Sequence, residues 1–288
     1  MFLAVGCSGG DADPEAHATE GPPASPEIHV SGFAASEAVR HDPEVDVYLV
    51  ANISGDPTGK DDDGFISRVS PDGEVLELRW IDGADEAVTL HAPKGMALKG
   101  DTLFVADIDV VRAFDRHTGA PLQERPVPGA EFLNDVAVGG DGTVYVTDTG
   151  AGVLYRFEGT EPVVLAAGEA LGRPNGVDVD EHGVVIVAWD GGARRVDPET
   201  GAITPLPAPD GERLDGVVLL DDGSYLVSSW DHEAVLRVHA DGAVDTVLAG
   251  VPRAADIGLD PTRRRVLVPT FDNVLHGVPL PRSDGGQE

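Results

Sequence analysis

A block of about 40 residues repeats along this chain, and the repeat restricts the fold more than any other feature of the sequence. In the stretch EFLNDVAVGGDGTVYVTDTGAGVLYRF, from Glu131 to Phe157, apolar residues alternate with small or polar ones at the period of a β-strand. Blocks aligned on Asn134 follow one another at intervals of 40 or 41 residues, and a further copy lies upstream. The aligned positions are Glu37, Lys94, Asn134, Asn175, Asp215 and Asp256. Repeats of this length with several short strands each predict a β-propeller, here with six blades.

The two ends of the repeat region predict how the propeller closes. We expect an all-β propeller of four-stranded blades over residues 27–281. The last repeat, from Ala255 to Leu280, contains only three predicted strands, and the run Glu27–Ser31 has no partner in its own repeat. We therefore predict that the N-terminal strand completes the last blade, because this pairs an edge that would otherwise stay open. Asp-Gly pairs at 72–73, 141–142, 222–223 and 241–242 predict tight hairpins.

The net charge of −31, from 51 acidic and 20 basic residues, limits the partners of the chain. Such a surface repels nucleic acid and anionic membranes, so neither is expected as a partner. The acidic residues are spread along the chain, and adaptation to high salt and an ordinary acidic exported protein both account for them. No apolar run predicts a transmembrane span. We expect a monomer that binds a small molecule.

The first 26 residues differ in composition from the repeats. Cys7, the only cysteine, follows a short apolar run and precedes Ser8, an arrangement that resembles the lipobox of bacterial lipoproteins. The run is shorter than the apolar core of a full signal peptide, and a free thiol on the terminus is the alternative. We predict a truncated signal sequence with a lipid anchor at Cys7, a disordered tether up to residue 26 and a disordered tail over 282–288. The protein is then exported to the cell envelope, periplasmic or on the surface; without the lipobox it is cytoplasmic.

The aligned position near the start of each repeat is polar in all six copies, yet its identity differs from copy to copy. The first strand of each propeller blade lines the central channel, so these side chains converge around one axis. A structural requirement would repeat one residue type, whereas a ligand site breaks the symmetry. Three carboxylates and one lysine leave a charge of −2, which balances one divalent cation. Oxygen donors without histidine or cysteine favour calcium or magnesium. A channel filled with hydrogen-bonded polar groups and water is the alternative.

A second position, at the end of the second predicted strand, carries nearly the same residue throughout: Asn52, Asp107, Asp148, Asp190, Asp231 and Asp272. Uniformity indicates a structural role, and we expect each side chain to accept a hydrogen bond from a backbone amide of the next turn. Trp189-Asp190 and Trp230-Asp231 resemble the WD-repeat signature, but they occur in two repeats only. We interpret this as coincidence.

The dipeptides at the aligned position resemble those of the senescence marker protein, regucalcin and gluconolactonase family. The matches are Glu37 in SEAV, Asn134 in LNDV, Asn175 in PNGV and Asp215 in LDGV, in register over residues 30–280. The resemblance implies that these four residues hold one divalent cation. Calcium is the ion we expect, and zinc, magnesium and manganese are the alternatives. It also implies that Asp215 activates water against a lactone or ester carbonyl.

Three residues around the implied ligands bear on the substrate. Phe132 stands where sugar-lactone members commonly have arginine, which predicts a less polar substrate. Asp256 is an additional carboxylate, and Lys94 is expected either to orient an anionic substrate or to pair with Asp256.

The sequence thus predicts a calcium-dependent hydrolase of lactones or related esters, with Asp215 as general base and ligand. One alternative is a non-catalytic binding propeller of the cell envelope, in which the ion organises a face that binds a small ligand or a protein. In a third interpretation calcium only rigidifies the channel.

Overall fold

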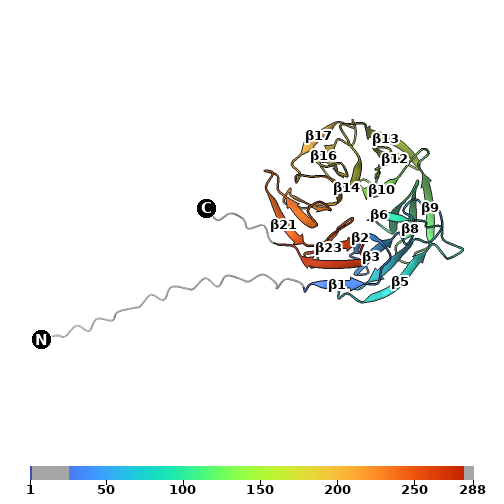
Figure 1. Ribbon diagram of the computed structural model, residues 1–288, viewed down its shortest axis with the longest axis horizontal. Helices are drawn as coiled ribbons and strands as arrows, with labels where there is room; N and C mark the ends of the chain where they lie inside the picture. Colours follow the sequence, from blue (N-terminus) through green and yellow to red (C-terminus); the bar gives the residue numbers. More distant parts are fainter. Residues whose placement is uncertain (2–25, 282–288) are drawn as a thin grey trace.

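The computed structural model describes residue 1 and residues 26–281, and the latter form six four-stranded antiparallel sheets around a central axis (Figure 1). The described part of the chain contains no helix, so the prediction of an all-β propeller is confirmed. Accordingly, none of the described segments is a helix with the length and apolarity needed to span a bilayer. Cys7, most of the predicted tether and the predicted tail at 282–288 lie outside the described residues, and what we expect of them stays a prediction.

The first three blades follow the chain from the channel outwards. Blade 1 contains β2 (Ser36–Asp42), β3 (Val47–Asn52), β4 (Phe65–Val69) and β5 (Val75–Asp82). Blade 2 contains β6 (Pro93–Lys99), β7 (Thr102–Asp107), β8 (Val110–Asp115) and β9 (Pro121–Pro126). Blade 3 contains β10 (Leu133–Val138), β11 (Val144–Asp148), β12 (Val153–Glu158) and β13 (Glu161–Ala167).

The remaining blades repeat this plan until the last, which takes its outer strand from the start of the chain. Blade 4 contains β14 (Pro174–Asp180), β15 (Gly183–Ala188), β16 (Ala193–Val196) and β17 (Ile203–Leu206). Blade 5 contains β18 (Leu214–Leu219), β19 (Tyr225–Ser229), β20 (Ala234–Val238) and β21 (Val244–Ala249). Blade 6 contains β22 (Gly258–Asp260), β23 (Arg265–Thr270), β24 (Val274–Pro279) and β1 (Ile28–Ser31).

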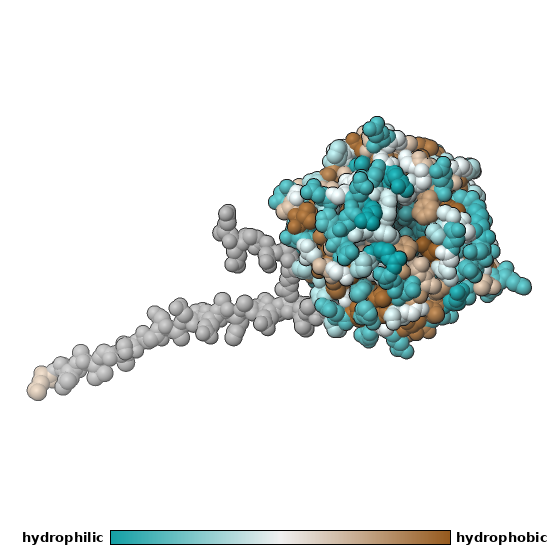
Figure 2. Space-filling model, viewed as in Figure 1, coloured by the Kyte–Doolittle hydropathy of each residue, from teal (hydrophilic) through white to brown (hydrophobic). Residues whose placement is uncertain are grey.

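The hydrophobic core is divided into wedges between neighbouring blades. The second strands are the most buried, since every residue of β3, β15 and β23 is buried. Outer strands such as β9 and β21 are largely exposed. Figure 2 shows one face of the disc, on which hydrophilic residues dominate and hydrophobic residues form small patches. Each blade therefore buries its apolar surface against its neighbours.

The predicted hairpins adopt the backbone conformation that their glycines permit. Gly73, Gly142, Gly223 and Gly242 have φ angles of 88°, 90°, 80° and 90°. Residues with a Cβ rarely adopt this region, so the Asp-Gly pairs fix these turns.

The ring closes where β1 adds to β24, as the sequence predicts. The two strands pair in antiparallel register from Ile28 opposite Gly277 to Ser31 opposite Val274. Ile28 and Val30 are buried between blades 6 and 1. The first and last parts of the described chain thus lie side by side (Figure 1).

A buried polar network crosses the seam between the last and the first blade. The Arg265 guanidinium, on β23, donates to the Tyr48 hydroxyl at 2.9 Å and to the carbonyl of Pro26 at 2.7 Å. The Tyr48 hydroxyl, from blade 1, donates to Asp260 Oδ2 at 2.8 Å. Arg265 is 1% exposed, so its charge depends on these partners for stabilisation.

Removal of residues 1–31 should destabilise the propeller, because it exposes the β24 edge and deletes two buried side chains. Burial of Ile28 and Val30 accounts for about 3–6 kcal/mol. We expect a loss of this size in the free energy of unfolding, measured by urea denaturation. The matched control lacks residues 1–25 and keeps Pro26; its midpoint should equal that of the full chain. Equal midpoints for all three proteins would contradict the closure argument.

Candidate functional site

Side chains from the first ends of the inner strands surround a cavity of about 550 Å³ at one mouth of the channel. Five of the six aligned polar residues line it: Glu37 on β2, Lys94 on β6, Asn134 on β10, Asn175 on β14 and Asp215 on β18. Phe132 also lines the cavity, whereas Asp256 does not. The structure therefore brings together all four predicted ligands, and it separates Asp256 from them.

Each of the four predicted ligands presents a buried oxygen atom that no hydrogen bond satisfies. These atoms are Glu37 Oε2, Asn134 Oδ1, Asn175 Oδ1 and Asp215 Oδ1. The residues are only 2–6% exposed. A buried polar atom without a partner costs about 1–3 kcal/mol. Four such atoms at one cavity indicate a site built to contact a ligand.

The donor set fits a hard divalent cation. Two carboxylates and two amides supply oxygen atoms, and neither histidine nor cysteine is among the residues that line the cavity. Calcium takes about six to eight oxygen ligands and accepts irregular geometry and water, while magnesium demands a near-ideal octahedron. Soft ligands that would select zinc over these ions do not occur in the set.

Burial raises the pKa of the two carboxyl groups among the predicted ligands. The pKa of Glu37 lies well above its usual value because of burial, and the charges of Asp215 and Asp256 add to the shift. Burial, helped by the charge of Asp256, raises the pKa of Asp215 to about 8, while a hydrogen bond from Trp230 acts against the shift. Without a cation, both groups therefore resist ionisation near neutral pH.

Lys94 is buried and fully engaged within the cavity wall. Its Nζ donates to the carbonyls of Pro57 and Ala92 at 2.9 and 3.0 Å and lies 4.5 Å from the centroid of the Phe132 ring. Burial lowers the pKa of Lys94 to about 8, although the negative charges of Glu37 and Asp107 act to raise it. Lys94 thus does not pair with Asp256, which was one of the two roles expected for it; the other, to orient an anionic substrate, stays a prediction.

Asp256 lies deeper in the channel, where it pairs with Arg40. Asp256 Oδ2 and Arg40 Nη2 are 2.7 Å apart, and the same Nη2 lies 3.4 Å from Asp135 Oδ1. Nη1 of Arg40 donates to the carbonyls of Val39 and Ile257 at 2.9 and 3.0 Å. Sequence analysis missed Arg40 and Asp135. The available signal was that Asp135 follows the aligned residue where three other repeats have glycine.

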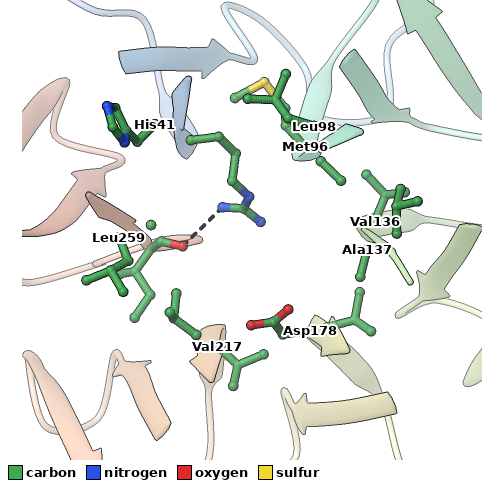
Figure 3. A pocket seen from close by; sticks show the side chains of 15 residues that line it. His41, Met96, Leu98, Val136, Ala137, Asp178, Val217 and Leu259 are labelled. Carbon is green, nitrogen blue, oxygen red and sulfur yellow. Dashed lines mark hydrogen bonds between the residues drawn. The ribbon is translucent and has the colours of Figure 1, made fainter. Parts of the chain in front are cut away.

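Figure 3 shows the cavity at the opposite mouth of the channel, which measures about 280 Å³. Its wall is mostly aliphatic, with Val136, Val217 and Leu259 around it, and the Asp178 carboxylate projects among them. The oxygens of Asp178 accept hydrogen bonds from the amides of Val179 and Leu219 at 2.8 and 2.9 Å. The Asp178 carboxylate is therefore satisfied by backbone amides of the protein.

The inner strands approach one another closely where the aligned residues stand. A Cβ atom added to Gly95 would lie 1.9 Å from Asp135 Oδ1 and 2.5 Å from its Cα. At Gly176 it would lie 2.3 Å from the carbonyl oxygen of Asp215. At Gly216 it would meet the Cα of Asp256 at 2.6 Å. Glycine at these positions lets neighbouring strands meet at the axis.

The second repeated position accepts backbone hydrogen bonds, but mainly from a different loop than expected. The amides belong to the segment that leads into the inner strand, and only Asp148 also accepts one from the following turn, from Ala151 at 3.0 Å. The pairs are Asn52 with Ala34, Asp107 with Ala92, Asp148 with Phe132, Asp190 with Arg173 and Asp231 with Glu212, at 2.8–3.0 Å. Asp272 instead pairs with the Arg253 guanidinium. These contacts hold the loops that carry Phe132 and Arg173 at the cavity.

The fold and this cavity define a six-bladed propeller with a polar site at the channel mouth. No protein-family model and no curated protein matches the chain. A gluconolactonase from Xanthomonas campestris has a similar structure, with a TM-score of 0.65 and 17% identity over 88% of this chain and 89% of that one. Virginiamycin B lyase from Staphylococcus aureus is also similar in structure, with a TM-score of 0.64 and 11% identity over 89% of this chain and 99% of that one.

A chain of a nidogen/laminin complex is also similar, with a TM-score of 0.60 and 21% identity over 74% of this chain and 80% of that one. The expected likeness to a gluconolactonase is therefore confirmed as a likeness of fold. Because the similar structures differ in what they do, the activity has to be argued from the site.

The raised pKa values predict how the metal-free protein responds to pH. Asp215 and Asp256 have folded pKa values of about 8 and about 6, above about 3.9 in unfolded chains. Their contribution to stability is present below about pH 4 and is lost as pH rises through about 6 to 8. In EDTA at constant ionic strength, the melting temperature should fall between about pH 5 and pH 8.

Two comparisons isolate the site in this pH experiment. Calcium should raise the melting temperature strongly at the higher pH and little at the lower one, because it binds the ionised carboxylates. Asp215→Asn should reduce both the pH dependence and the calcium effect. A melting temperature that is independent of pH and of calcium would contradict the interpretation.

The Arg40–Asp256 pair gives a separate prediction. Arg40→Met leaves Asp256 buried without its partner, so the free energy of unfolding should fall by about 3–5 kcal/mol. Asp256→Asn in the same chain should restore much of the loss, because an amide tolerates burial better than a carboxylate. Urea denaturation of the single and double variants measures both. If the double variant is no more stable than Arg40→Met, the pair does not act as described.

Proposed function

We propose that the protein is a hydrolase of lactones or related esters that depends on a divalent cation, with calcium as the preferred ion. The observation that carries the proposal is the set of four unsatisfied, buried oxygen atoms from Glu37, Asn134, Asn175 and Asp215 at one cavity. Burial raises the pKa values of Glu37 and Asp215, and neighbouring carboxylates add to both shifts, so a bound cation would stabilise the ionised groups. The similar structure of a gluconolactonase supports the choice of reaction.

In this proposal Glu37, Asn134, Asn175 and Asp215 hold the ion. The ion supplies Lewis-acid stabilisation of the negative charge that develops on a carbonyl oxygen. The chain supplies orientation and a base. The cavity walls limit the access of bulk water, and the buried carboxylates concentrate negative charge where the cation is needed.

Asp215 is the residue we assign as general base. We assign its unsatisfied Oδ1 to the ion and the other oxygen of the carboxylate to the proton of a water molecule. As the water oxygen bonds to the carbonyl carbon, its proton passes to Asp215; the carbon–oxygen bond of the ester then breaks, and the proton returns to the departing alkoxide. Hydrolysis of a lactone yields a single hydroxy acid, and the carboxylate of Asp215 is restored.

Histidine-based chemistry receives less support from the cavity. A virginiamycin B lyase from Staphylococcus aureus in which a histidine is replaced by alanine is catalytically inactive. No histidine is among the described residues that line this cavity. A lyase of that kind would therefore lack its histidine here.

A non-catalytic binding propeller is the second candidate, since a chain of the nidogen/laminin complex shares the fold. In that case the ion organises the channel mouth for a ligand or a protein partner. Binding without turnover distinguishes the two candidates.

Asp215→Asn should lower kcat/KM for lactones by about 10²–10⁴-fold, the contribution of a positioned general base. The assay follows hydrolysis of a panel of lactones and esters with calcium present. The matched control is Asp221→Asn, which makes the same chemical change at an exposed site and should leave the rate unchanged. Asn175→Ala should reduce the calcium content found by elemental analysis. A wild-type protein that turns over no member of the panel would refute the hydrolase and favour the binding propeller.

A further inference from the structure

At one position of the repeat, the residues that line the cavity differ between blades 1 to 3 and blades 4 to 6. This position is the residue that directly follows the second strand of each blade: Ile53, Ile108, Thr149, Trp189, Trp230 and Phe271. All but Ile108 line the cavity. Blades 1 to 3 place aliphatic or small residues there, whereas blades 4 to 6 place aromatic residues. Like the aligned polar position, this position differs in residue type from blade to blade.

The three aromatic rings form one continuous wall, which we call the aromatic wall. The centroids of Trp189 and Trp230 lie 4.9 Å apart at an interplanar angle of 80°. Those of Trp230 and Phe271 lie 5.5 Å apart at 68°. The indole of Trp230 also donates to the carbonyl of Ala254 at 2.9 Å, which fixes its orientation. Edge-to-face packing of this kind holds the rings in place before any ligand arrives.

The rest of the cavity offers few free polar groups above the four unsatisfied oxygens. Lys94 is occupied by two carbonyl groups and the Phe132 ring. The hydroxyl of Thr149 donates to the carbonyl of Pro174 at 2.6 Å. Glu131 and Arg173 line the cavity as well, and both are exposed at its edge. A polyhydroxylated substrate would need a partner for each hydroxyl group, and the aromatic wall does not supply them.

We propose that the aromatic wall is a subsite for an apolar substituent, so that the preferred substrates are lactones or esters carrying an alkyl or aryl group near the reactive carbonyl. The proposal rests on the proposed function, because the unsatisfied oxygens place the carbonyl end of the substrate. The cavity volume of about 550 Å³ leaves room for a lactone ring and a side chain together. Trp189, Trp230 and Phe271 then determine specificity, and sugar lactones are poor substrates.

The test measures kcat/KM for δ-lactones that differ only in an alkyl chain, from unsubstituted δ-valerolactone to a hexyl-substituted ring, beside glucono-δ-lactone. Each added methylene should raise kcat/KM about fourfold until the wall is covered, the factor that corresponds to about 0.8 kcal/mol per buried methylene. The quantity compared is the ratio of the hexyl-substituted to the unsubstituted lactone. This ratio is insensitive to changes in the amount of active protein.

Trp189→Ala and Phe271→Ala should each lower this ratio by about tenfold, because a truncated ring no longer covers the alkyl chain. Trp230 is left intact because it contacts Asp215. Trp80→Phe is the control, since Trp80 lies on β5 of blade 1 and packs against Arg68, outside the cavity. If alanine prevents folding, Trp189→Gln keeps much of the volume but not the apolar face and should also lower the ratio. A ratio near one in the wild type, a ratio unchanged in these variants, or a preference for glucono-δ-lactone would overturn the proposal.

A binding measurement separates failure of the subsite from failure of the hydrolase. 2-Alkylcyclohexanones resemble the lactones but cannot be hydrolysed, and their binding to Trp80→Phe protein is followed through the fluorescence of Trp189 and Trp230. Affinity that rises with chain length, without lactone turnover, supports the subsite and refutes the hydrolase. Turnover without any dependence on chain length supports the hydrolase and refutes the subsite. Absence of both refutes both.

Discussion

The inner strands of the blades meet so closely around the axis that no side chain fits at Gly95, Gly176 or Gly216. This steric constraint has a direct chemical result. The residue before each glycine directs its side chain into the cavity, while the glycine faces the backbone of the next blade. The close approach therefore brings side chains from different blades into a small volume, where their charges interact strongly because little water screens them.

The buried carboxylates at the two ends of the channel differ in whether the protein itself supplies their partners. Around Arg40, carboxylates from β10 and from the start of blade 6 find a cation within the protein, and Asp178 is held by backbone amides. At the other mouth, Glu37 Oε2 and Asp215 Oδ1 have no partner within the protein. The buried Lys94 beside them donates to two carbonyl groups and contacts the Phe132 ring. Internal pairing at one end and its lack at the other explain why only one mouth is a candidate site. A structural role alone would favour completing the pairs at both ends.

Much of this could be predicted from the sequence because the repeat imposes a register. The interval of 40 or 41 residues gives the number of blades, and the polar identity of one aligned position gives the residues of the cavity. Arg40 was missed because it stands three residues further along its strand, where most blades have an aliphatic residue and no pattern marks the exception. Pairs such as Arg40 with Asp256 depend on which strands adjoin at the axis, and alignment of repeats does not report this.

The aromatic wall was missed for a different reason. Trp189 and Trp230 stand beside Asp190 and Asp231, and alignment on the acidic residues hides their relation to Ile53 and Thr149. Strand pairing shows that the second strands end at unequal distances from the acidic residue: Asp148 is the last residue of β11, while Asp190 lies beyond the end of β15 at Ala188. Only the end of the strand, which depends on hydrogen bonds to the neighbouring strand, places the aromatic residues in one row.

The pairing of β1 with β24 also sets the order in which the molecule can assemble. Ile28 lies opposite Gly277, so the first of the described strands can pair only after the last of them has been synthesised. Blades 1 to 5 are built from consecutive strands and have local partners, whereas the sixth blade requires closure of a loop that contains nearly the whole propeller. Until then β1 remains an unpaired strand, open to wrong partners. Residues of all six blades, from Glu37 to Phe271, line the cavity at the axis, so the cavity is complete only when the ring has closed.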